Sequence, residues 1–390
     1  MLFDEIVKSS YSGAEYPVLG AFSREWAYTR PFEGLRVLVA TPIFRNTLLE
    51  YRALLAGGAV LTVGCAGTSA AGASMPCDDG VVRLLRESGI AVISPEEALA
   101  LEASGRGFDL VLDCAGQFAC LSPKFGFVEL TRSGVHFYEG AAKPVYVADS
   151  GLVKRIETSL GTGEGYVRAL RQLGYGPDFS DKKFVVFGSG KVGAGIVLQL
   201  LRSDAAVDVV TDTSFGVNAF LDANGVPVTD CKDAGAVAAL VRAADFVVTA
   251  TGVKGALDCP PVVEALLASE AVLANMGVED EYGSNVPAAR VLAEKKPLNF
   301  ILEEPTHLKY IDASLALHAA LGEQLVRETA GVEDVSAYKE TAAESATVKT
   351  VCALMEPPED LERKILMTTV QEGLIGPEVC EMLGGLPSDD

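Results

Sequence analysis

Three glycines in the second half of the chain, Gly188, Gly190 and Gly193, have the spacing of a phosphate-binding turn. They follow the apolar segment KKFVVFG, which predicts a buried strand, and they open a helix predicted over 191–201. At such a junction the first glycine permits a tight turn, the second lets the backbone approach a pyrophosphate, and the third lets helix and strand pack closely. The helix N-terminus adds backbone N–H donors and the positive end of its dipole. The pattern therefore predicts a dinucleotide-binding site.

An acidic residue, Asp212, ends the next apolar segment, VDVVTDT. A carboxylate at this strand end can accept hydrogen bonds from both hydroxyls of an adenosine ribose and would repel a 2′-phosphate, which favours NAD over NADP. Two later strand ends, Thr249 to Gly252 and Asn275 to Gly277, should lie at the same sheet edge and add cofactor contacts. The alternative is that the glycines serve only a turn, that Asp212 caps a helix, and that the later loops are ordinary connections.

The segments around this motif alternate strand and helix along most of the chain. One helix is predicted over 95–103, with Ser94 as its N-cap. Strands are predicted in LRVLVAT, AVLTVG, IAVI, FDLVLD, SGVHFY and KPVYVAD, and, after a helical stretch over 151–173, in KKFVVFG, VDVVTD, ADFVVTATG, AVLANMG and LNFILEE. The expected fold class is α/β, with a Rossmann-type NAD-binding domain and a second α/β domain completed by C-terminal helices.

The Gly and Pro residues of GYGPD predict a domain border there. We expect an NAD-binding domain over 178–312 and a substrate-binding domain over 1–177, with a helical return over 313–390. The run GTGEG resembles a phosphate loop, but no strand precedes it and no lysine follows it, so a flexible bend is expected. C-terminal helices are predicted over 311–327, 338–355, 359–372 and 377–383.

The composition excludes several classes of partner. Acidic residues outnumber basic residues by 53 to 32, and the formal charge of −21 opposes nucleic-acid phosphates and anionic membrane surfaces. The N-terminal MLFDEIVKSS lacks the features of a secretory signal, and no long uncharged apolar stretch predicts a membrane span. The eight cysteines form no CxxC pair, which favours reduced thiols and a cytoplasmic location. No metal site is predicted.

With these residues in view, the chain resembles the S-adenosylhomocysteine hydrolase family. The matching segments occur in family order over roughly 35–324: LDCAG at Leu112, TRSGVH at Thr131, PVYVADS at Pro144, GSGKVGAG at Gly188, TATG at Thr249 and NMGVEDE at Asn275. The resemblance implies a substrate domain, split between the N-terminal part and a C-terminal return, that closes on a central NAD domain. In that family a tightly held NAD oxidises the ribose 3′-hydroxyl, which allows thiol elimination and water addition before the hydride is returned.

The resemblance carries over the cofactor half of the family's site. Lys191 and Val192 match its phosphate loop, and Thr131 and Ser133 match two of three threonines that reach NAD, while the middle one is Arg132 here. The predicted cofactor-binding residues are therefore Gly188, Gly190, Lys191, Val192, Gly193, Asp212, Thr131, Ser133, Thr251, Gly252, Asn275, Met276 and Gly277.

The catalytic half of the family's site is not carried over. The second aspartate of a family pair is Cys114, and the second of two glutamates is Leu130, so the carboxylate that holds the ribose hydroxyls is lost. The family's lysine position matches Val153, with Lys154 one residue later, and its histidine after the NxG loop is Val278. The family's C-terminal tail is also absent. A chain with these changes is not expected to hydrolyse S-adenosylhomocysteine at a useful rate.

Other side chains could then supply acid–base chemistry. His307, in EEPTHLKY, is the first candidate, with a purely hydrogen-bonded histidine as the alternative. Lys154 and Glu129 could bind an acidic or amino group of the substrate, or could be solvated charges. His136 and His318 are expected to be packing residues. Cys114 could be a nucleophile, although inert packing is the expectation.

Three functions remain open at this level. The leading hypothesis is an NAD-dependent oxidoreductase of a small polar metabolite. The second is a hydrolase or lyase of the adenosylhomocysteinase type, which uses bound NAD for internal redox on a nucleoside or thioether. The third is an NAD-binding regulatory protein without catalysis. A homo-oligomer, most simply a dimer, is expected.

Overall fold

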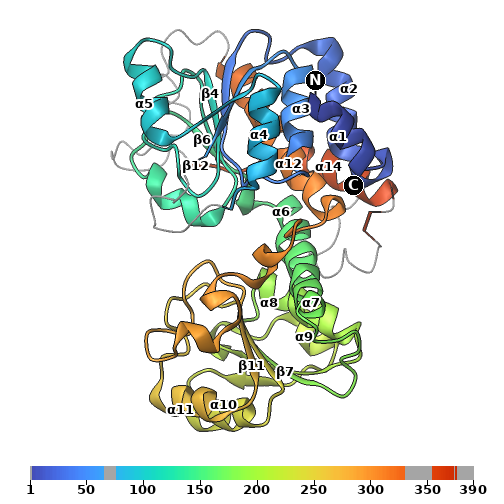
Figure 1. The fold of residues 1–390 in the computed structure, drawn as a ribbon, viewed down its shortest axis with the longest axis vertical. Helices are drawn as coiled ribbons and strands as arrows, with labels where there is room; N and C mark the ends of the chain where they lie inside the picture. The colour runs from blue at the N-terminus through green and yellow to red at the C-terminus, as the bar shows by residue number, and fades with distance from the viewer. Residues whose placement is uncertain (1, 66–75, 330–353, 373, 376–390) are drawn as a thin grey trace. The chain divides into compact units, whose positions relative to one another are not determined.

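A computed structural model describes residues 2–65, 76–329, 354–372 and 374–375. The chain forms two compact units, Met1–Lys154 with Leu308–Asp390 and Arg155–His307 (Figure 1). The sequence placed these borders at 177/178 and 312/313. The first border falls earlier because the helices over 156–172 belong to the second unit, and the second falls earlier because the helix that starts at Leu308 belongs to the first. That the first unit binds substrate stays a prediction.

The first unit is built on a parallel sheet. Among the described residues its seven strands have the order β12-β6-β5-β4-β1-β2-β3. Their bounds are β1 Arg36–Val39, β2 Val60–Gly64, β3 Ala91–Ile93, β4 Leu110–Asp113, β5 Gly126–Glu129, β6 Val145–Val147 and β12 Leu354–Met355. The chain therefore runs outward from β1 to one edge and then returns to build the other side from β4, which is the doubly wound arrangement.

Helices cover this sheet and complete the unit. They are α1 Leu2–Ser10, α2 Pro17–Thr29, α3 Leu48–Ala56, α4 Asp79–Glu87, α5 Pro95–Ala103, α12 Leu308–Thr329 and α14 Glu359–Gln371, while the border between the units falls within α6 Val153–Arg155. The predicted cap Ser94 accepts a hydrogen bond from the Glu97 amide. Helix α12 packs on β4 and β5, and its buried Asp312 accepts hydrogen bonds from the first-turn amides of Val18 and Leu19 in α2. Helix α12 therefore ties α2 to the sheet.

The second unit is also doubly wound. Its described strands are parallel and have the order β11-β10-β7-β8-β9. Strand β7 is the first of them in the chain and the central one in the sheet. The strands are β7 Lys183–Phe187, β8 Ala206–Thr211, β9 Val228–Asp230, β10 Phe246–Thr249 and β11 Val272–Asn275. The helices are α7 Thr162–Gln172, α8 Lys191–Leu201, α9 Ala219–Ala223, α10 Ala234–Arg242 and α11 Pro260–Ala268, with a π-helical turn over Ile156–Gly161 before α7.

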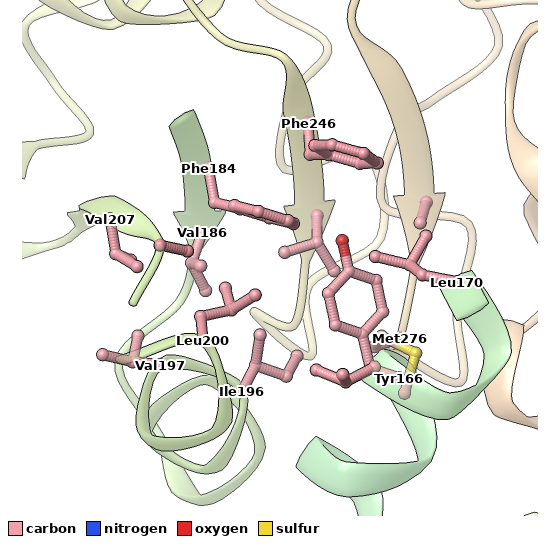
Figure 2. Packing of buried hydrophobic residues seen from close by; sticks show 14 of the residues in the cluster. Tyr166, Leu170, Phe184, Val186, Ile196, Val197, Leu200, Val207, Phe246 and Met276 are labelled. Atoms are coloured by element: carbon pink, nitrogen blue, oxygen red, sulfur yellow. The ribbon is translucent and has the colours of Figure 1, made fainter. Parts of the chain in front are cut away.

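Two apolar clusters cover the two faces of this sheet. Phe184 and Val186 of β7 and Phe246 of β10 join a cluster completed by α7 and α8, including Tyr166 and Met276 (Figure 2). The alternate residues of the same strands join a second cluster with α10 and α11. Successive side chains of a strand point to opposite faces, so a strand buried on both faces is apolar throughout, as KKFVVFG is.

Several sequence-based predictions are corrected by the structure. SGVHFY and LNFILEE do not form strands, because Arg132–Tyr138 and Leu298–Ile301 are 3₁₀-helices. The segment 161–165 is helical rather than a flexible bend: a Cβ added to Gly163 would lie 2.3 Å from the Gly195 carbonyl oxygen, so the glycines let α7 and α8 meet at backbone contact.

At the C-terminal end, most of 338–355 and all of 377–383 lie outside the described residues. The last two residues of the first segment, Leu354–Met355, are a strand that pairs with β6 rather than a helix. The helix predicted over 359–372 is confirmed as α14. Within the described residues no helix has the length and apolarity to span a membrane.

Candidate functional site

The glycine turn lies at the carboxyl end of β7. Gly188 has φ +103°, and a Cβ there would lie 2.3 Å from the Ala250 carbonyl oxygen of the loop after β10. A Cβ on Gly193 would lie 2.1 Å from the Gly188 carbonyl oxygen. Both positions therefore require glycine, for the two reasons that the sequence indicated. Because β8 and β10 flank β7 on opposite sides, the turn lies at the topological switch point of the sheet.

Gly190 differs from its two neighbouring glycines. It is the N-cap of α8, its φ is −70°, no side chain caps the helix there, and a Cβ would have no atom within 4 Å. Protein packing therefore does not require a glycine at this position. The first-turn amides of α8, on Lys191, Val192 and Gly193, point out of the helix end, where an anion is favoured. These residues fit a pyrophosphate at the helix N-terminus.

Asp212 follows the last residue of β8, as predicted. Its Oδ1 accepts hydrogen bonds from the Ser214 amide (3.0 Å) and hydroxyl (2.5 Å), and Lys232 Nζ lies 2.9 Å away. The hydrogen bond from Ser214 and then that from Lys232 lower the pKa of Asp212 to about 2. The carboxylate is therefore ionised at every physiological pH and can accept ribose hydroxyl donors. Asp212 also caps the short 3₁₀-helix Thr213–Phe215, so both roles foreseen for it are compatible.

The loop after β10 is fixed by a buried carboxylate. Glu281 is fully buried, and its two oxygens accept hydrogen bonds from the amides of Thr251 (2.8 Å) and Gly252 (2.7 Å). A Cβ on Gly277 would lie 2.0 Å from Glu281 Oε1. These three predicted cofactor residues lie at the expected sheet edge, with two of their amides already bonded within the protein. Sequence reasoning assigned no role to Glu281, although it ends the quoted segment NMGVEDE.

Asn275 and Met276 have internal roles in the structure. The Asn275 side chain is fully buried; its Oδ1 accepts from Thr249 Oγ1 and the Gly277 amide, both at 2.9 Å. Its Nδ2 lies 2.6 Å from the Lys295 carbonyl oxygen. The Met276 side chain packs in the cluster of Figure 2. Contacts of these two residues with a cofactor would therefore come from their backbone.

The first unit holds two carboxyl groups at the ends of paired strands, Asp113 of β4 and Glu129 of β5. Glu129 is fully buried, and its oxygens accept hydrogen bonds from the amides of Ala115 (2.9 Å) and Gly116 (3.0 Å). The Thr131 amide and hydroxyl both donate to Glu129 at 2.7 Å. Burial raises the pKa of Glu129, and these hydrogen bonds act against that rise. Glu129 thus fixes the loop after β4 and presents no surface to a ligand.

Asp113 is equally buried and accepts hydrogen bonds from the Tyr138 hydroxyl (2.6 Å) and the Phe118 amide (2.8 Å). Burial, together with the nearby Glu129, raises the pKa of Asp113 to about 7. Cys114 is buried beside it. Ser133 lies 3.1 Å, hydroxyl to hydroxyl, from Thr131. Thr131 and Ser133 belong to the first unit, so a role at the glycine turn of the second unit stays a prediction.

The candidate acid–base residues His307 and Lys154 differ in their exposure to solvent. His307 ends the second unit, and its Nδ1 lies 3.0 Å from Glu164 Oε1, with Arg168 Nε 3.0 Å from the other oxygen. Burial acts to raise the pKa of Glu164, but the hydrogen bond from His307 and the charge of Arg168 hold it below its usual value. The His307 side chain is 40% exposed. Lys154, in contrast, is buried, with 3% exposed.

The other histidines match the sequence interpretation in part. His318 is fully buried on α12, but its Nδ1 lies 2.8 Å from the buried Glu50 Oε1, so it is an ion-paired residue as well as a packing one. Burial opposes protonation, yet Glu50 raises the pKa of His318 overall. His136 is exposed, with its ring tilted against that of Phe137, so the prediction that it packs in the core is wrong. The described residues contain no group of His, Cys, Asp and Glu side chains arranged to hold a metal ion.

Comparison with known proteins agrees with this placement. The model of an NAD(P)-binding family, NAD_binding_7, matches residues 177–259, which include the glycine turn and Asp212. Adenosylhomocysteinase from Archaeoglobus fulgidus is 28% identical over 311 residues, which cover 72% of this chain and 70% of that protein.

Among solved structures, a component of dipicolinate synthase from Bacillus halodurans has a TM-score of 0.45 at 12% identity, over 74% of this chain and 97% of that one. L-alanine dehydrogenase has a TM-score of 0.40 at 11% identity, over 85% and 99% of the two chains. Such distant structural likenesses support no conclusion about function. The sequence matches, together with the α/β fold and the glycine turn, show that the chain has an NAD(P)-binding domain and is distantly similar to adenosylhomocysteinase.

Proposed function

We propose that this protein is an NAD-dependent enzyme and that it oxidises or reduces a small polar metabolite. The observation that carries the proposal is the open position at Gly190, at the N-terminus of α8, with the ionised Asp212 at the end of the neighbouring strand. The α8 amides would hold the pyrophosphate and Asp212 the adenosine ribose. A 2′-phosphate would meet the negative charge of Asp212, so NAD is the proposed cofactor rather than NADP.

NAD, when bound, supplies a hydride acceptor, and the chain must manage the proton on the reacting oxygen or nitrogen. We assign this role to His307. With Glu164 accepting the hydrogen of Nδ1, the neutral ring carries its lone pair on Nε2, which is the atom that would take the proton. Glu164 then stabilises the resulting imidazolium, and Arg168 keeps Glu164 ionised and oriented. This Glu164–His307 pair is the acid–base device of the proposal.

The buried carboxyl groups of the first unit favour this reaction over hydrolysis of S-adenosylhomocysteine. Glu129 matches one member of the family's double glutamate, and the position after it is Leu130. Since Glu129 is fully buried and bonded to its own loops, no carboxylate at this position is available to hold ribose hydroxyls. The alternative, internal redox on a nucleoside or thioether, is favoured by the similarity to the archaeal adenosylhomocysteinase and needs a rebuilt substrate contact.

One assay distinguishes the candidates. Purified protein receives NAD and a panel of small alcohols, amines and hydroxy acids, or S-adenosylhomocysteine, while NADH absorbance and adenosine release are followed together. Net NADH with a panel member supports the oxidoreductase, and adenosine without net NADH supports the hydrolase type instead. NAD binding with neither product would replace both by a regulatory role.

A pair of glycine variants tests the cofactor position itself. Gly190→Ala introduces a methyl group that meets no protein atom, so the fold should be unchanged while NAD affinity falls at least about tenfold, because the methyl occupies the position of the pyrophosphate. Gly235→Ala, in α10 of the same unit, is the matched control, since its nearest contact is 3.5 Å away. Equal NAD affinity in the two variants, by calorimetric titration, would remove the cofactor assignment.

A further inference from the structure

Two cysteines that are 12 residues apart in the sequence meet at the carboxyl edge of the first unit's sheet. Cys65 follows β2 directly, Cys77 precedes α4, and their Sγ atoms are 2.9 Å apart. A disulfide bond measures about 2.05 Å, so the two sulfurs need to approach by only about 0.9 Å. Both thiols are partly exposed, so a small reagent can reach them.

The backbone on both sides of this pair is anchored. The Cys65 amide donates to the Ile93 carbonyl (2.8 Å), which extends the pairing of β2 with β3. Cys77 forms a bridge with Ile43: the Ile43 amide donates to the Pro76 carbonyl (3.1 Å), and the Asp78 amide donates to the Ile43 carbonyl (2.8 Å). The thiols therefore meet because the fold holds both chain segments in place.

We propose that Cys65 and Cys77 form a reversible disulfide, and that this pair is a thiol–disulfide exchange site for small disulfides such as glutathione disulfide. The Cys65 sulfur attacks the glutathione disulfide and releases one glutathione thiol, which leaves a mixed disulfide on Cys65. The Cys77 sulfur then attacks Cys65 Sγ and releases the second glutathione, so two protein thiols are oxidised while one disulfide is reduced to two thiols.

The order of these two steps follows from the environment of the pair. The hydrogen bond with Cys65, and then burial, raise the pKa of the Cys77 thiol far above its usual value. A raised pKa disfavours the Cys77 thiolate, so we assign the first attack to Cys65, although either sulfur can donate the hydrogen bond between them. The site rests on no part of the proposed cofactor chemistry, because both cysteines belong to the first unit and the glycine turn to the second.

The test uses the full chain and glutathione disulfide. No lysine or arginine lies between Arg52 and Arg83, so trypsin leaves both cysteines in one peptide, and cleavage at Met75 separates them unless a disulfide joins them. After oxidation and blocking with N-ethylmaleimide, we expect this peptide to be unalkylated, lighter by two hydrogens and still joined after cleavage at Met75. The yield should be at least about tenfold higher in the native protein than in concentrated urea, where the pair is not held together.

Three variants make the outcome decisive. Cys120→Ser removes an exposed thiol of the same unit and should leave the yield of the linked peptide unchanged. Cys65→Ser should abolish it, and Cys77→Ser should trap glutathione on Cys65, with the fluorescence of the buried Trp26 reporting an intact first unit in each case. Recovery of both cysteines alkylated, while the exposed Cys120 and Cys231 carry glutathione, would overturn the proposal.

Discussion

Replacement by phenylalanine should change the stability of the second unit in opposite directions at two buried tyrosines. Tyr166 and Tyr282 are both fully buried. The Tyr282 hydroxyl lies 3.0 Å from the carbonyl oxygens of Val247 and Ala274, on neighbouring strands. The Tyr166 hydroxyl points into the apolar cluster of Figure 2 and has no hydrogen-bond partner among the described residues. Replacing each by phenylalanine removes one oxygen atom and little else.

The expected magnitudes follow from these surroundings. A hydroxyl buried without a hydrogen-bond partner lowers the free energy of unfolding by about 1–3 kcal/mol. Removing its oxygen leaves a small void, and the cost of this void offsets only a few tenths of that gain. We therefore expect Tyr166→Phe to stabilise the second unit by about 1 kcal/mol. Tyr282→Phe removes a hydrogen bond and leaves buried carbonyls with one partner fewer, so it should destabilise the unit by about 1–2 kcal/mol. The two variants should thus differ by about 2–3 kcal/mol.

Hydrogen exchange of the β7 and β10 amides, followed by mass spectrometry, measures this difference in the unit concerned. A difference of 2 kcal/mol corresponds to about a 30-fold ratio of protection factors. Trp26, the chain's single tryptophan, lies in the first unit, so its fluorescence in urea is an internal reference that neither variant should move. Loss of protection in Tyr166→Phe as large as that in Tyr282→Phe would show that the Tyr166 hydroxyl has a partner, such as a buried water, and would refute the reasoning.

Three further predictions concern charge. His307→Gln should lower kcat by about 100-fold on the substrate found in the NADH assay and leave NAD affinity unchanged, because it removes only the proposed proton acceptor; an unchanged kcat would contradict the assignment. Asp212→Asn should reduce the preference for NAD over NADP at least about tenfold in equilibrium titrations, and a constant ratio would remove Asp212 from ribose recognition. Burial raises the pKa of Asp312 to about 7, so the folded state binds a proton that the unfolded state has lost. The first unit should therefore lose stability as pH rises from about 4 to 7, and this loss should be steeper in the wild type than in Asp312→Asn. Urea unfolding followed by Trp26 fluorescence measures it, and identical slopes in the two proteins would count against a protonated Asp312.

The glycine turn and α8 could be predicted from the sequence because their determinants are local. A strand, three glycines at fixed spacing and a helix occupy one continuous segment, and the conformational demands at Gly188 and Gly193 follow from that spacing alone. The predicted helix over 191–201 has the observed bounds of α8. Most strands were recognised for the same reason, since parallel strands buried on both faces are short apolar runs.

The errors arose where tertiary contacts decide the local conformation. In SGVHFY the apolar alternation is too short to distinguish a strand from a 3₁₀-helix, and a Cβ on Gly134 would lie 2.3 Å from the Glu129 carboxyl. The true strand is the preceding segment, β5, which carries Glu129. No local pattern indicates that this glutamate turns inward to bind the amides of Ala115 and Gly116. The meeting of Cys65 and Cys77 is equally invisible in the sequence, because the Cys65 segment pairs with β3 and the Cys77 segment with the loop at Ile43.

The two units fix the loop after their fourth strand in the same way. In each unit the strand order places the fourth strand beside the first, and two successive amides of the loop after it bind a glutamate from the end of the fifth strand or just beyond it. Glu129 and Glu281 thus fill the anion position of that loop in the first and second unit. The loop after the first strand is therefore where the two units differ. In the first unit it contains Pro42, which has no amide hydrogen, whereas in the second it ends at Gly190, where an added Cβ would have no atom within 4 Å. This difference supports the proposal that the NAD pyrophosphate binds at the N-terminus of α8 in the second unit.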